Sequence, residues 1–112
     1  MQALILEFSC WVEFEPAQEQ AMIEKVRQAI VASGHVILGK TDHVFEPQGY
    51  TVVWALAESH LAIHTYPEHG TAYLQLSSCS KPKYELFIQE LGALGYPLFN
   101  IVKNTTKAPL QE

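Results

Sequence analysis

Three strand-like stretches follow one another closely between residues 51 and 79. The stretch 51–57, TVVWALA, is almost uniformly apolar and rich in β-forming residues, which is typical of a central strand. The stretch 60–66 alternates and is stopped by Pro67, and 71–79 alternates again. This run therefore predicts the middle of a β-sheet.

Two segments have the apolar spacing of helices. The first opens at Glu15-Pro16, with proline in its first turn, and closes at Gly34, which we expect to be a left-handed cap. Its apolar stripe consists of Met22, Ile23, Val26, Ala29 and Ile30. The second helix is predicted to be capped by Ser80 and to end at Gly95.

The remaining strand-like stretches are 2–9, 35–45 and 97–104, and the residues that follow 104 are expected to form a frayed tail. We summarise the order as β-α-β-β-β-α-β, with five or so strands. It predicts one domain over 1–112 with an α+β fold, a two-layer α/β sandwich whose two helices cover one face of a mainly antiparallel sheet. Two helices cannot cover both faces, so we also expect a homodimer packed through the sheet.

Composition excludes several classes of partner. The 112 residues carry a net charge of -5 and no cluster of Lys or Arg, so neither nucleic acid nor a large anionic surface is an expected partner. The first residues have neither a secretory signal nor a membrane span, and the default compartment is the cytoplasm. Cys10 and Cys79 are too few for a disulfide scaffold, and we expect both thiols to be reduced.

The segment 57–70, AESHLAIHTYPEHG, places several ionisable groups in a stretch that otherwise resembles a buried strand. For any single histidine, a satisfied core side chain is the better interpretation; for the whole set it is weaker. A metal site of His60 and His64 would need a helix, because four strand residues separate the rings by roughly 13 Å. No metal is therefore expected. A hydrolase triad around Ser59 lacks the glycines of a nucleophile elbow.

The same residues carry a resemblance to a known family. The run from Glu58 to Glu68, with His43, Phe45, Pro47 and Gly49 upstream and Cys79 downstream, resembles the processing segment of the prokaryotic S-adenosylmethionine decarboxylase proenzymes. Tyr66 stands where the family usually has Trp. The resemblance covers residues 3–80 well and the last helix and strand loosely.

The resemblance implies a zymogen that makes its own cofactor. The Ser59 hydroxyl would attack the carbonyl carbon of Glu58, and β-elimination would then cut the chain into 1–58 and 59–112, leaving a pyruvoyl group on residue 59. In the family, the residues matching Thr51 and His64 assist this processing. Ser59 and His64 are an odd number of residues apart, so a flat strand would place them on opposite faces, and a bend near Glu58 is needed for them to cooperate.

The resemblance also implies how turnover works. The pyruvoyl carbonyl would form a Schiff base with the amino group of a small-molecule substrate and accept electrons as carbon dioxide leaves. Cys79 matches the proton donor, Phe45 the aromatic that stacks on adenine, and Glu68 an acid near the cationic substrate. From the residues alone, a buried Cys79, a core Phe45 and a solvated Glu68 remain alternatives. Cys10 has no matching role and is interpreted as a core residue.

Two departures concern the choice of substrate. Gln75 stands where the family usually has Asp, and Ser80 where it has Gly. We expect decarboxylation of S-adenosylmethionine, which serves spermidine and other polyamine biosynthesis. The alternatives are decarboxylation of arginine or ornithine by the same machinery, and a non-processing homologue that only binds a ligand.

Overall fold

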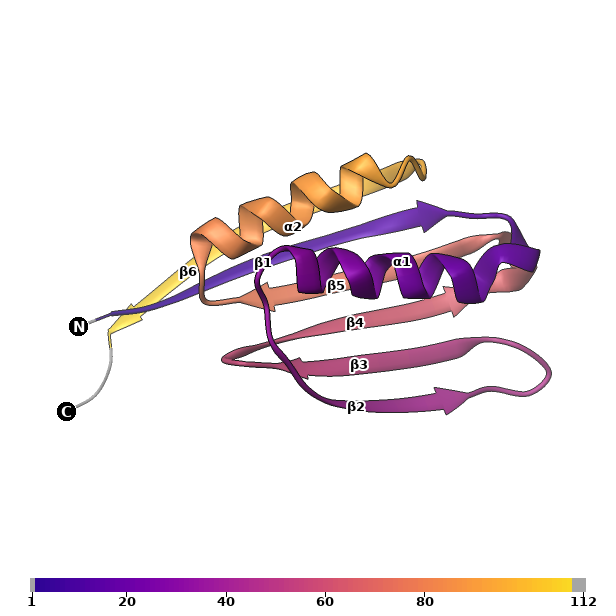
Figure 1. Cartoon of the computed structure of the whole chain (residues 1–112), viewed down its shortest axis with the longest axis horizontal. Coiled ribbons are helices and arrows are strands. Elements are labelled where there is room, and N and C mark those ends of the chain that lie inside the picture. Colours follow the sequence, from indigo (N-terminus) through magenta and orange to yellow (C-terminus); the bar gives the residue numbers. More distant parts are fainter. Residues whose placement is uncertain (1, 110–112) are drawn as a thin grey trace.

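The chain folds into one antiparallel sheet with two helices packed against it, and the computed structural model describes residues 2–109 (Figure 1). The strands are β1 (Gln2–Glu13), β2 (Ile37–Val44), β3 (Tyr50–Leu56), β4 (Ser59–Tyr66), β5 (Thr71–Ser78) and β6 (Leu98–Pro109). The helices are α1 (Glu19–Ala32) and α2 (Lys81–Ala93), and two short 3-10 turns are η1 (Pro16–Gln18) and η2 (Pro67–His69). The sheet order is β2-β3-β4-β5-β1-β6, and every neighbouring pair is antiparallel.

The predicted α+β class is confirmed, but the sheet has one strand more than the predicted order. Only Ala57 and Glu58 separate β3 from β4, and each segment forms its own strand. The frayed tail is wrong as far as residue 109, because the end of β6 pairs with the start of β1, up to Gln2 opposite Pro109. Residues 110–112 of that tail lie outside the described residues.

The core lies between the helices and one sheet face. The buried side chains of β1 point to this face at every second position, and Phe8 meets Phe87 of α2 edge to face with ring centroids 6.4 Å apart. The predicted stripe of α1 is buried in full: Met22, Ile23, Val26, Ala29 and Ile30. Both helices thus cover the same face, as Figure 1 shows and as the sequence predicts.

The helix ends follow local chemistry. Gly34 has a φ of 93°, a left-handed conformation that favours glycine, directly after the Ser33 cap of α1. The Ser80 hydroxyl accepts a hydrogen bond from the Lys83 backbone N–H at 3.5 Å and caps α2, as predicted. Before α1, Pro16 opens the 3-10 turn η1, so that α1 itself begins only at Glu19. Over residues 2–109, neither helix is long and apolar enough to cross a membrane.

The sheet face opposite the helices, which we call the open face, carries a row of side chains in register, one from each strand. Successive strand pairs align them across the whole sheet: His43, Thr51, His64, Tyr73, Trp11 and Phe99. The rings of Trp11 and Tyr73 lie 5.3 Å apart, and those of Trp11 and Phe99 lie 6.3 Å apart. Phe99 is 36% exposed and Tyr66, which also contacts Trp11, is 40% exposed. An aromatic cluster therefore faces away from the helices.

Candidate functional site

The predicted cleavage point lies in the tight turn between β3 and β4. Leu56 pairs with Ser59, so Ala57 and Glu58 form a two-residue loop. Glu58 has a φ of 65°, which is uncommon for a residue with a side chain and costs about 1 kcal/mol or more. The Ser59 hydroxyl donates a long hydrogen bond of 3.5 Å to the Ala57 carbonyl. The peptide that links residues 58 and 59 is therefore held in a strained, exposed hairpin end.

Cys79 reaches this turn from the other side of β4. It follows the last residue of β5, and its thiol donates to the Glu58 carbonyl oxygen, with a distance of 2.9 Å from Sγ to O. Both Cys79 and Glu58 are exposed. A donor on a carbonyl oxygen draws electron density from the carbonyl carbon and stabilises negative charge that develops on the oxygen. Glu58, Ser59 and Cys79 together form what we call the hairpin end of the site.

Thr51, His64, Phe45 and Glu68 gather elsewhere, at what we call the cavity end. Thr51 and His64 are directly opposite each other on β3 and β4, and the Thr51 Oγ1 lies 3.0 Å from the His64 Nδ1. The His64 ring stacks on Tyr73 with centroids 6.3 Å apart. All four residues line one cavity of about 370 Å³, together with Gln48, Gly49, Thr65 and Tyr66.

The β2–β3 loop brings Phe45 over this cavity. The Phe45 backbone N–H donates to the Gly49 carbonyl at 2.9 Å, and Gly49 adopts a φ of 107° that a residue with a side chain would rarely accept. The Phe45 ring contacts His43 edge to face at 4.5 Å and remains 48% exposed. An exposed ring beside a cavity can stack on a flat ligand, so the interpretation of Phe45 as a core residue is wrong.

One chain does not bring the two ends of the site together. Strand β4 pairs with β3 without a register shift from Ser59 to Thr65, so the five residues from Ser59 to His64 span roughly 16 Å. Leu61 and Ile63 are buried under the helices, which places Ser59 on the helix face and His64 on the open face. The bend expected near Glu58 does not bring the Ser59 and His64 side chains together within this chain.

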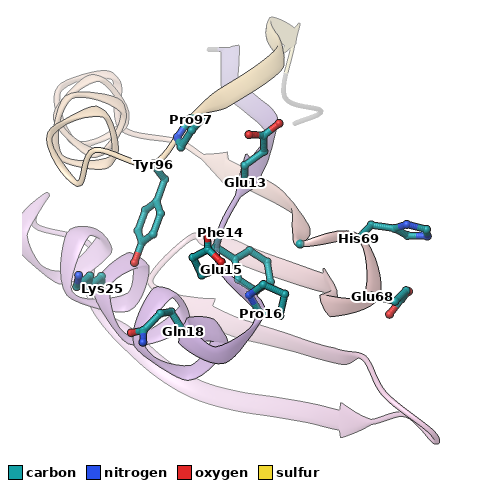
Figure 2. A pocket seen from close by; sticks show the side chains of 11 residues that line it. Glu13, Phe14, Glu15, Pro16, Gln18, Lys25, Glu68, His69, Tyr96 and Pro97 are labelled. Carbon is teal, nitrogen blue, oxygen red and sulfur yellow. The ribbon is translucent and has the colours of Figure 1, made fainter.

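A larger cavity lies away from this chemistry. It has a volume of about 640 Å³ and lies between α1, the loop before η1 and the loop after α2 (Figure 2). Lys25 sits 5.7 Å from the centre of the Tyr96 ring at one side, whereas Glu68 and His69 lie at the far side. Glu68 lines both cavities and is the link between them.

The remaining residues singled out from the sequence have simpler positions. Cys10 is fully buried, and burial raises the pKa of its thiol to about 11, so the core interpretation is confirmed. Gln75 is exposed and pairs with Ser9 and Ala62 on the open face. Ser80 caps α2, a task that glycine could not perform with a side chain. His60 is exposed on the same face as His64 and lies four strand residues from it.

Sequence reasoning missed a buried polar group near the hairpin end. His35 is 5% exposed and bonds Ser33 and Ser78, two residues that are themselves buried. Burial, with the nearby positive charge of Lys83 as a second cause, lowers the pKa of His35. Nothing local distinguishes His35, because its partner Ser78 is 43 positions away in the chain. Only the pairing of distant elements reveals this contact.

The S-adenosylmethionine decarboxylase family sequence profile matches residues 3–94. The chain belongs to the S-adenosylmethionine decarboxylase family. The S-adenosylmethionine decarboxylase proenzyme of Prochlorococcus marinus is 39% identical over 88 residues, which are 74% of this chain and 70% of that protein. The proenzyme of Thermotoga maritima is 40% identical over 62 residues, 55% of this chain and about half, 48%, of the relative's length.

The fold agrees with this assignment. The crystal structure of the adenosylmethionine decarboxylase from Aquifex aeolicus superposes with a TM-score of 0.68, covers 100% of this chain and 96% of that one, and is 21% identical. Membership of the S-adenosylmethionine decarboxylase family confirms the predicted family and the carboxy-lyase class. The matches support a self-processing S-adenosylmethionine decarboxylase and do not favour the arginine, ornithine or binding-only alternatives.

Proposed function

We propose that this chain cleaves itself between Glu58 and Ser59 and then decarboxylates S-adenosylmethionine with the pyruvoyl group formed on residue 59. The observation that carries the proposal is the contact of the Cys79 thiol with the Glu58 carbonyl oxygen at 2.9 Å. This carbonyl is the group that Ser59 must attack, and it is the one carbonyl in the turn that accepts from the thiol.

Cleavage and formation of the pyruvoyl group use only groups of the chain and one water molecule. The Ser59 Oγ forms a bond with the Glu58 carbonyl carbon, the peptide C–N bond breaks, and the hydroxyl proton passes to the freed amine. A base then removes the Cα proton of residue 59. The backbone carboxylate of Glu58, which becomes the new C-terminus, leaves from the Cβ of residue 59. Water adds to the resulting dehydroalanine after tautomerisation, and ammonia departs. Serine needs such activation, because its hydroxyl is a weak nucleophile at its ordinary pKa.

The hairpin end supplies the first half of this chemistry. The Cys79 thiol stabilises the negative charge that forms on the Glu58 oxygen when Ser59 attacks. The strain of Glu58 at a φ of 65° is relieved when the peptide bond breaks, which favours cleavage at this bond. After cleavage the same thiol lies beside the new end of chain 59–112, where it can return a proton to the product.

The cavity end supplies the second half. The Thr51 hydroxyl lies 3.0 Å from the His64 Nδ1, and in the tautomer whose Nδ1–H donates to Thr51, the Nε2 of His64 is unprotonated and can take a proton. Because roughly 16 Å of strand separates Ser59 from His64 in one chain, we assign the base to a second copy. The Ser59 side chain points to the helix face, so the Cα–H that the base removes is directed away from that face, and a two-fold dimer packed through the open face would bring each hairpin end to the cavity end of the other copy.

The open face has the chemistry of such an interface. Its centre is aromatic, with Trp11 in contact with Tyr66, Tyr73 and Phe99. Val102 on the same face is 49% exposed. Aromatic residues at the centre of a patch are typical of protein interfaces, and covering them with a second copy removes them from water. The dimer thereby both covers the second face of the sheet and completes two sites.

The cavity end also fits the substrate. The pyruvoyl group supplies an electrophilic carbonyl that binds the substrate amine and accepts electrons as carbon dioxide leaves. Phe45, at the rim of the cavity, can stack on the adenine ring, and Glu68 places a carboxylate near the positive sulfonium. A neighbouring copy would position this cavity over the hairpin end, and we expect the chain to work in the cytoplasm.

Denaturing mass spectrometry of the purified protein tests the proposal. We expect two chains, 1–58 and 59–112. The mass of the second should be lower, by the mass of one ammonia molecule, than that of a chain 59–112 that begins with an unmodified serine. Ser59→Ala should give one intact chain, whereas the control Ser9→Ala, which alters a serine of β1, should be cleaved. An intact wild-type chain would refute the proposal. We expect the cleaved protein to release carbon dioxide from S-adenosylmethionine and not from arginine or ornithine.

A further inference from the structure

Three buried polar side chains connect α1 to the corner between β5 and α2. Ser33, His35 and Ser78 are 2%, 5% and 1% exposed. The Ser33 Oγ lies 2.7 Å from the His35 Nδ1, and the His35 Nε2 lies 2.9 Å from the Ser78 Oγ. Burying such groups is costly unless each one is hydrogen-bonded, and here each one is.

The hydrogen bonds have one direction. The Ser33 hydroxyl donates to the Ile30 carbonyl at 2.7 Å, so it must accept from the N–H at the Nδ1 of His35. Burial lowers the pKa of His35 and favours the neutral ring, whose Nε2 then accepts from the Ser78 hydroxyl at 2.9 Å; the Ser80 carbonyl, 3.4 Å from the same hydroxyl, is the more distant of its two acceptors. Ser78 in turn accepts from the Ser80 backbone N–H at 3.3 Å. The donors and acceptors match along this whole series of hydrogen bonds with one tautomer of His35.

This network fixes the two neighbours of Cys79. Ser78, before it, is held by His35, and Ser80, after it, caps α2 and accepts a further bond from the Tyr84 N–H at 2.9 Å. Cys79 itself is exposed and directs its thiol at the Glu58 carbonyl. In Figure 1 the end of α1, the start of α2 and the β3–β4 turn lie at the same end of the molecule.

We propose that His35 is a positioning residue for self-cleavage, which acts through Ser78 to hold the Cys79 thiol on the Glu58 carbonyl. His35 contacts neither of these two groups. Its Nε2 fixes the side chain of Ser78, and this fixes the backbone that carries Cys79. The inference rests on the proposed function for its effect on cleavage, but the effect on the thiol stands on the hydrogen bonds alone.

Two amide substitutions test the roles of the two imidazole nitrogen atoms separately. In His35→Gln the amide reaches the place of Nε2 and can keep the bond to Ser78, whereas in His35→Asn it reaches the place of Nδ1 and can keep only the bond to Ser33. We expect His35→Gln to cleave within about threefold of the wild-type rate. We expect His35→Asn to cleave between about ten- and a hundredfold more slowly, because the thiol is misplaced.

A second readout does not depend on cleavage. In the Ser59→Ala background the chain cannot cut itself, and the alkylation rate of Cys79 reports how its thiol is held. Cys10 does not interfere, because it is fully buried and burial raises the pKa of its thiol to about 11. His35→Asn should change the alkylation rate severalfold, and His35→Gln should leave it near that of the parent chain.

The outcomes distinguish this inference from the function on which it rests. Equal cleavage rates and equal alkylation rates for the Gln and Asn variants would overturn the positioning role. A wild-type chain that never cleaves would overturn the proposed function, while the alkylation rates would still decide for or against positioning. If a His35 variant does not fold, Ser78→Ala against Ser78→Thr tests the same link from its other side, with slow cleavage expected for Ala and near-normal cleavage for Thr.

Discussion

The hairpin end and the cavity end of the site differ in how they are built. At the hairpin end, Cys79 and Glu58 come from separate turns and meet through one thiol–carbonyl contact. At the cavity end, Thr51 and His64 are regular strand residues held opposite each other by the sheet register. Residues 58–68 are one continuous stretch, yet they serve two places roughly 16 Å apart. Nearness in the sequence therefore conceals two places with different roles: the hairpin end holds the peptide bond that is cut, and the cavity end supplies the base for the cut and binds the substrate.

Removing the thiol should affect the hairpin end most strongly. Cys79→Ala deletes the donor on the Glu58 oxygen, and we expect cleavage to slow by about ten- to a hundredfold without being abolished. Decarboxylation by the cleaved fraction should fall too, because its proton donor is gone. A time course of cleavage after cell-free synthesis measures the first effect. The control Cys10→Ala should lower stability and leave the cleavage rate unchanged; normal cleavage in Cys79→Ala would remove the thiol from processing.

Removing the ring of Phe45, the part of the cavity end proposed to stack on the substrate, should leave cleavage intact. Phe45→Ala removes an exposed ring from the rim of the cavity, and the loss of stacking should raise the KM for S-adenosylmethionine by about tenfold. Steady-state kinetics and denaturing mass spectrometry on the same preparation check both statements. If Phe45→Ala blocks cleavage as fully as Ser59→Ala does, Phe45 serves processing and not substrate binding alone.

The smallest expected effect is on how the stability of the folded protein changes with pH. The pKa of His35 is lowered from its ordinary 6.5, so the unfolded chain binds more protons at this residue than the folded chain does. The stability that the neutral ring contributes is therefore complete above pH 6.5 and declines as the pH falls through the folded pKa. Urea unfolding across this range should show a shallower decline for His35→Gln than for the wild type. Identical profiles would show that His35 does not titrate as its burial next to Lys83 implies.

Local chemistry explains what could be predicted from the sequence. Gly34 and Ser80 were expected to end and cap the helices, and they do, because these preferences depend on a few neighbouring atoms. The apolar periods predicted both helices and the strands. Register between strands depends on distant pairing, so the sequence could predict neither that β6 extends to Pro109 nor that β4 runs without a bend from Ser59 to His64. The thiol–carbonyl contact joins positions 21 apart and has no local signal.

The central claim is that Ser59 and the His64 that serves it belong to different copies of the chain. Coexpression of Ser59→Ala with His64→Ala tests it directly, because only a mixed dimer holds one complete site. We expect neither variant to cleave alone, and the mixture to yield the fragment 59–112 that bears the His64→Ala substitution, identified by its mass. If the mixture forms dimers and no such fragment appears, or if His64→Ala cleaves normally by itself, the two-copy site is contradicted.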